Sequence, residues 1–156
     1  MQKIITDTVC DNIAKLLTER INTISKDNYK TYFVKTYRSW NDDNIALTEY
    51  PVLKVFRVKD NFNNQGYKII SNIIVQYSFV MNKDFSYIPF LNQVGKLINS
   101  LMVMLEKEDV IIISREVPIT GEIQVTQGKD DIYGLYTYSC ALCDSSVPDN
   151  LIAYLL

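Results

Sequence analysis

Apolar side chains recur every three or four residues in two stretches of the chain, and each stretch predicts an amphipathic helix. The first covers residues 3–26, with its apolar face formed by Ile5, Val9, Ile13, Leu16, Leu17, Ile21 and Ile24. The second covers residues 87–106, and Ser86 is a suitable N-cap for it. We expect this second helix to lie across a sheet through Leu91, Val94, Ile98, Leu101 and Leu105.

Alternating apolar and polar residues predict strands over residues 29–39, 52–59 and 67–81. In the third of these strands, the odd-numbered residues from Ile69 to Met81 are apolar except for Ser71, and we expect their side chains to face the core. The even-numbered residues, which include Asn72, Gln76 and Ser78, should face water or a partner. Three more strands are predicted over 109–114, from Ile119 with a break near Gly121, and over 132–142, the last two joined by a turn at Gly128–Asp131.

This order of elements, α-β-β-β-α-β-β-β, predicts an α+β fold with a mainly antiparallel sheet. Both helices should pack on one face of the sheet, which leaves the other face for water or for assembly. Residues 1–143 are predicted to form a single α+β domain, and residues 144–156 an apolar C-terminal arm.

The last residues of the arm are strongly apolar and need something to bury them. Two partners are open: the sheet of the same chain or a neighbouring subunit. The residues assigned to this contact between subunits are Leu151, Ile152, Tyr154, Leu155 and Leu156.

Composition and charge exclude several classes of function. The 156 residues contain 16 Lys and Arg against 18 Asp and Glu, so the formal net charge is −2 and gives no basic footprint for nucleic acid. The chain has no His, which removes the commonest general base and the commonest metal ligand. No glycine-rich phosphate loop occurs. We therefore expect no cofactor, no metal and no enzymatic activity.

The remaining chemical candidates have simpler structural interpretations. Cys140 and Cys143 form a C-x-x-C inside a strand rather than at a helix start, so we expect ordinary reduced thiols, as for Cys10. The acidic pairs at 42–43 and 130–131 are expected to be solvated turns. The tyrosines of the last strand, Tyr133, Tyr136 and Tyr138, are expected to pack across the sheet.

The apolar stretches contain too many polar residues for a signal peptide or a transmembrane helix, so no membrane is expected as a partner. We expect synthesis in the cytoplasm.

The extended segments "YFVKTYRSW", "YPVLKVFRV" and "IIVQYSFVM" lie between the two helices and are followed by a hairpin and an extended tail. This pattern resembles the tail terminator, or tail-completion, proteins of tailed bacteriophages and phage-tail-like particles. The resemblance implies a hexameric ring that caps the tail tube, ends its polymerisation and joins the tail to the neck protein. In contractile particles the ring also contacts the end of the sheath. DNA only passes through the lumen, which suits an acidic chain.

Under this resemblance the protein is a virion component of the tail–neck junction, assembled in the cytoplasm of the host bacterium. A hairpin reaching a partner ring is assigned to Asp60, Asn61, Phe62, Asn63, Asn64 and Gln65. Two alternatives stay open. One is another neck or head–tail connector ring protein, and the other, from a different class, is a small cytoplasmic ligand-binding domain.

Overall fold

The computed structural model describes residues 7–27, 33–42, 44–62, 68–82 and 87–145. Its helices and strands follow the chain in the order α1 (Thr8–Asp27), β1 (Thr36–Arg38), the 3-10 turn η1 (Leu47–Glu49), β2 (Val52–Phe62), β3 (Lys68–Asn82), α2 (Tyr87–Lys107), β4 (Thr120–Gln127) and β5 (Asp131–Ser145). Ser86, the predicted N-cap of α2, lies outside the described residues, as do the first residues of the predicted N-terminal helix.

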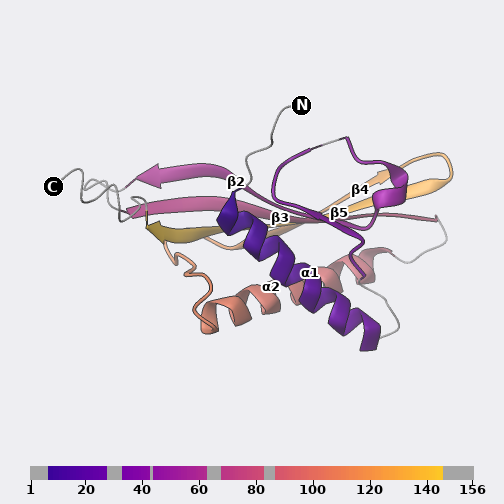
Figure 1. Cartoon of the computed structure of the whole chain (residues 1–156). Helices are drawn as coiled ribbons and strands as arrows, with labels where there is room; N and C mark the ends of the chain where they lie inside the picture. Colours follow the sequence, from indigo (N-terminus) through magenta and orange to yellow (C-terminus); the bar gives the residue numbers. More distant parts are fainter. Residues whose placement is uncertain (1–6, 28–32, 43, 63–67, 83–86, 146–156) are drawn as a thin grey trace, which may run out of the picture.

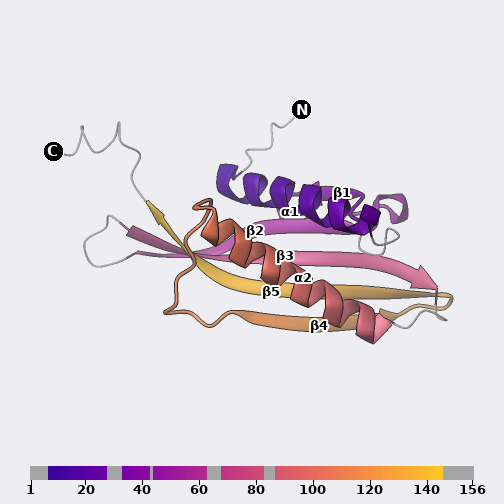
Figure 2. The same ribbon diagram turned by 90° about the horizontal axis from the view of Figure 1, so that it is seen from below.

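The described strands form one sheet in the order β1-β2-β3-β5-β4, in which every neighbouring pair except β1 and β2 is antiparallel (Figures 1 and 2). The α+β fold with a mainly antiparallel sheet is thus confirmed. The two long central strands, β3 and β5, pair along their whole length. A short β1 at one side and β4 at the other form the two edges.

Both helices lie on the same face of the sheet, and Figure 2 shows them in front of the strands. The predicted stripe of α2 is confirmed, because Leu91, Val94, Ile98, Leu101 and Leu105 are all buried. They pack in one core with the residues of β3 that were predicted to face inward, of which Ile73, Val75, Tyr77 and Phe79 are buried. A helix that covers a sheet buries one stripe, so the period of its apolar residues decides its orientation.

The predicted strand over 109–114 is wrong. This segment makes a single bridge to the sheet, between Ile113 and Leu142. Although the middle of the segment is entirely apolar, its side chains are alternately buried and exposed: Ile111 is buried and Ile112 is exposed. β4 occupies the same side of β5 from Ile132 to Ser139, so only the last part of β5 is left for this segment. The sheet therefore has five described strands where six were expected.

Three predicted boundaries also need correction. Of the strand expected over 29–39, residues 29–32 lie outside the described residues. Among the others only β1 is a strand, because the backbone N–H and C=O of Val34 are bonded to the Asn22 side chain of α1 at 2.6 and 3.0 Å. β2 continues to Phe62, through residues assigned to a hairpin connection. β4 passes Gly121 without a break, and β5 runs on to Ser145, into the segment predicted as the arm.

The second face of the sheet is partly covered, although it was expected to be left for water or for assembly. The segment after β1 arches over this face in Figure 1. Arg38 holds it by donating hydrogen bonds to Asp42 and Glu49, each at 2.9 Å. Lys54, buried on this face, donates to the carbonyl oxygen of Asp42 at 3.2 Å.

Candidate functional site

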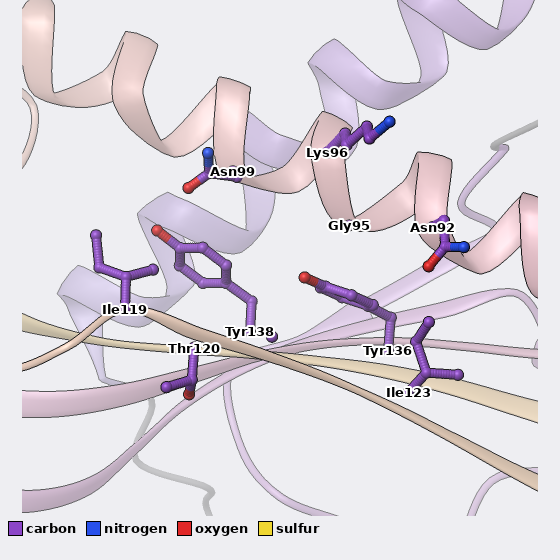
Figure 3. Close-up of a pocket in the computed structure, with 10 residues that line it drawn as sticks. Asn92, Gly95, Lys96, Asn99, Ile119, Thr120, Ile123, Tyr136 and Tyr138 are labelled. Atoms are coloured by element: carbon purple, nitrogen blue, oxygen red, sulfur yellow. The ribbon is translucent and has the colours of Figure 1, made fainter.

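A cavity of about 640 Å³ lies on the helix-covered face, between α2 and the hairpin of β4 and β5. Three segments build it: one face of α2, the start of β4 with the residue before it, and the middle of β5. Figure 3 shows two tyrosine rings that rise from β5 toward α2, with two asparagines of α2 on either side. The lining residues are Asn92, Gly95, Lys96, Asn99, Ile119, Thr120, Gly121, Ile123, Tyr136 and Tyr138.

Tyr136 is held between two glycines. A Cβ atom at Gly95 would lie 2.5 Å from Cε2 of the Tyr136 ring, and a Cβ at Gly121 would overlap the Tyr136 hydroxyl. Both glycines are thus required by the close approach of one ring, which joins α2 to the edge strand β4. An aromatic ring laid over a glycine of an edge strand also covers backbone that would otherwise be exposed.

Tyr138 brings an unused hydrogen-bonding group to this cavity. Its side chain is buried, and its hydroxyl has no hydrogen-bond partner among the residues the structure describes. Burial raises the pKa of this phenol above its ordinary value, so the hydroxyl stays protonated and can donate. This hydroxyl interacts with the side chain of Cys140 and opposes the rise in pKa that burial gives that thiol, although the two groups do not meet ordinary hydrogen-bond geometry. An unpaired buried hydroxyl costs free energy, which a ligand atom or a partner chain can recover.

The chemistry of the lining favours a partner that is apolar and carries hydrogen-bond acceptors. The amide side chains of Asn92 and Asn99 can donate, as can the ammonium group of Lys96. None of the lining residues is acidic. The apolar part of the lining comes from Ile119 and Ile123, each 37% exposed. The cavity therefore combines a positive group with an exposed apolar surface.

β4 forms the outer wall of this cavity and is an exposed edge. Every residue of the strand is exposed except Val125, which is half-buried. Its only strand partner within the described ranges is β5. Glu122 is its single charged residue, and it contains no proline or lysine of the kind that usually protects an edge. Such a strand can accept another chain.

A second polar cluster lies near the N-terminal end of α1. Asp7 accepts hydrogen bonds from the backbone N–H groups of Val9 and Cys10, at 3.1 and 3.3 Å, and so caps the helix. Its carboxylate also pairs with Arg57 of β2, whose Nε lies 2.6 Å from Oδ2. The hydrogen bond from Arg57 holds the pKa of Asp7 below its usual value.

Arg57 also explains two residues singled out in the sequence. Ser71, the polar residue on the core parity of β3, is hydrogen-bonded to the Arg57 guanidinium. Asp60 accepts a hydrogen bond from Arg57 Nη1 at 3.2 Å. Asp60 is thus part of an intramolecular ion pair beside the start of α1.

The other residues assigned to the hairpin fall into two groups. Asn61 and Phe62 are exposed at the end of β2, with Phe62 67% exposed. Asn63, Asn64 and Gln65 lie outside the described residues. The residues assigned to the contact between subunits also lie outside them, namely Leu151, Ile152, Tyr154, Leu155 and Leu156.

The three cysteines are free thiols. Cys140 and Cys143 lie on opposite faces of β5, the first buried and the second exposed, as their spacing predicts. Burial raises the pKa of Cys140 to about 12, and burial next to Asp7 raises that of Cys10 to about 12. Within the described part of the chain, no group of three or more Cys, Asp or Glu residues is arranged to hold a metal ion.

The cavity could be predicted only in part from the amino-acid pattern. Tyr136 and Tyr138 were predicted to pack across the sheet, and Tyr136 does reach Gly121 of the neighbouring strand β4. The rise of both rings toward α2 was not predicted. The contribution of α2 was missed, although Asn92, Lys96 and Asn99 follow one another at helical spacing beside the apolar stripe. Two asparagines and a lysine at helical spacing beside a buried stripe are the signal that could have located the site.

The comparisons with known proteins add no family. No protein-family model matches the chain, and no curated protein matches it. Neither α1, α2 nor any other helix in the described ranges has the length and hydropathy needed to cross a membrane.

Proposed function

We propose that this chain is a structural virion protein, a tail terminator of a tailed phage or phage-tail-like particle. It closes into a hexameric ring that caps the tail tube, ends tube polymerisation and joins the tail to the neck. Its site of action is the tail–neck junction of the virion, after assembly in the host bacterial cytoplasm. Its partners are copies of itself, the tail tube protein, a neck or connector protein and, in contractile particles, the sheath.

The observation that carries this proposal is the open sheet with two unlike edges. β4 is long, exposed and almost uncharged, whereas β1, at the other side of the sheet, has three residues. A contact between unlike surfaces of two copies is heterologous, and such contacts close into a ring when the rotation fits. The resemblance of the order of helices and strands along the chain to that of tail terminators supplies the class of ring.

A second candidate function is favoured by the cavity. A volume of about 640 Å³ lies within the range of small-molecule sites, and its lining includes the donors Asn92, Lys96 and Asn99. A cytoplasmic ligand-binding domain would use this cavity as a monomer and would need no partner at β4. The two candidates therefore differ in the mass of the protein in solution.

Native mass spectrometry of the purified full-length chain tests the proposal. Six copies of the 18.0-kDa chain weigh about 108 kDa, and we expect this species to dominate. A single chain that carries a small organic ligand would instead establish the ligand-binding candidate. A connector ring of the neck would have a similar mass, so gold labelling of the isolated particle separates it from a terminator, which lies at the end of the tail tube.

A further inference from the structure

The exposed edge of β4 and the cavity behind it form one continuous surface. Ile119, Thr120, Gly121 and Ile123 line the cavity and belong to β4 or immediately precede it. Ile123 pairs with Tyr136, so its side chain lies on the same face of the sheet as the tyrosine ring. A strand added outside β4 would direct every second side chain toward this face, under α2.

We propose that residues 149–156 of a neighbouring copy add as a strand to β4 and insert their apolar side chains into this cavity. The inference rests on the proposed ring, because it requires a second copy beside the edge. It names the surface of the neighbouring copy that binds the arm, and it makes the cavity part of the contact between subunits.

The composition of the arm matches the surface. Residues 149–156, "DNLIAYLL", contain one charged residue, Asp149, and five large apolar or aromatic side chains. The lining of the cavity has one charged residue of the opposite sign, Lys96, and none of the same sign.

The length of the arm is sufficient. The eleven residues after Ser145 span at most roughly 36–40 Å when extended. The eight residues of β4 occupy roughly 27 Å at the usual rise of a strand. An arm from an adjacent copy can therefore cross a subunit boundary and still cover most of the edge.

The position of the segment 109–119 favours a neighbouring copy over the same chain. β5 ends at Ser145, six residues beyond Ser139, the last residue that pairs with β4. Over that distance the segment lies beside β5, where Ser114 N–H donates to the carbonyl oxygen of Ala141 and Cys143 N–H to that of Ile112. An arm returning to β4 of its own subunit would have to pass around this segment.

Photo-crosslinking in the full-length chain tests this inference. Tyr154 is replaced by p-benzoyl-phenylalanine, and protein labelled with ¹⁵N is mixed with unlabelled protein before assembly. We expect crosslinks from position 154 to peptides containing Ile123 or Lys96, with the two ends from differently labelled chains. The same photoreactive residue at the exposed Thr48 is the control, and it should give no crosslink to these peptides.

A pair of substitutions on β4 provides a second readout. Ile123→Glu places a charge on the cavity side of the edge, and Gln124→Glu places the same charge on the adjacent residue, whose side chain faces the opposite way. We expect Ile123→Glu to weaken self-association at least tenfold and Gln124→Glu to leave it nearly unchanged. Both side chains are exposed in the single chain, so circular dichroism should report the same fold for both variants.

The outcomes separate this inference from the proposed function. A ring whose crosslinks from position 154 lie elsewhere, or only within one chain, overturns the inference and leaves the ring intact. A single chain at every concentration overturns the ring and the inference together. Equal association of the two β4 variants also overturns the inference.

Discussion

Gly95→Ala tests the packing of Tyr136 between α2 and β4. The new methyl group would lie 2.5 Å from Cε2 and Cζ of the ring and 2.7 Å from its hydroxyl oxygen. Overpacking of this kind typically costs about 2 kcal/mol. Alanine in a helix interior is more favourable than glycine by about 1 kcal/mol. We therefore expect the free energy of unfolding to fall by about 1 kcal/mol.

The sign of the effect should reverse when the ring is removed. In the background Tyr136→Ala, the three atoms closest to the new methyl group are removed, so we expect the helix propensity to decide the effect. Gly95→Ala should then raise the free energy of unfolding by about 1 kcal/mol, a coupling of about 2 kcal/mol between the two positions.

The assay is urea unfolding followed by circular dichroism, at one protein concentration, for the four proteins of this cycle. Ser100→Ala, an exposed position of the same helix, is the matched control, and it should change stability equally in both backgrounds. Gly95→Ala with the same stabilising effect in both backgrounds would refute the packing described for Tyr136.

Two further predictions concern the other end of the sheet and the thiols. Asp7→Asn keeps a helix-capping side chain but loses the ion pair with Arg57, and should cost about 1 kcal/mol at pH 7 in chemical unfolding. Since the folded pKa of Asp7 is lowered, this difference should be present above pH 4 or so and vanish as the pH falls through the folded pKa; an unchanged difference at pH 2 would contradict it. With a thiol reagent at pH 8, Cys143 should react at once, and Cys10 and Cys140 only on unfolding; three fast thiols would contradict their burial.

The helices and the core positions could be predicted from local patterns. A helix on a sheet buries one stripe of side chains, and a strand covered on one face buries every second side chain. The buried stripe of α2 and the inward-facing residues of β3 were both predicted in this way. The strand over 109–114 was mispredicted for a non-local reason. Its sequence suits a strand, but β4 already occupies most of that side of β5, and no local pattern reports this competition.

The candidate site was harder to predict than the fold. Its residues come from α2, the start of β4 and the middle of β5, and only the register of the β4–β5 hairpin brings Gly121 and Ile123 beside Tyr136 and Tyr138. Asp60 was missed as an ion-pair partner for a similar reason, since the register shift between Arg57 and Lys59 places Asp60 opposite Ser71, on the side of Arg57.

Whether copies of this chain close into a ring is decided by imaging. The full-length protein is fractionated, its mass is measured by light scattering, and the same fractions are examined by negative-stain electron microscopy. We expect particles of about 108 kDa whose averaged views show six-fold symmetry and a central hole. Compact particles of about 18 kDa at high protein concentration would contradict the ring and, with it, the proposed tail terminator.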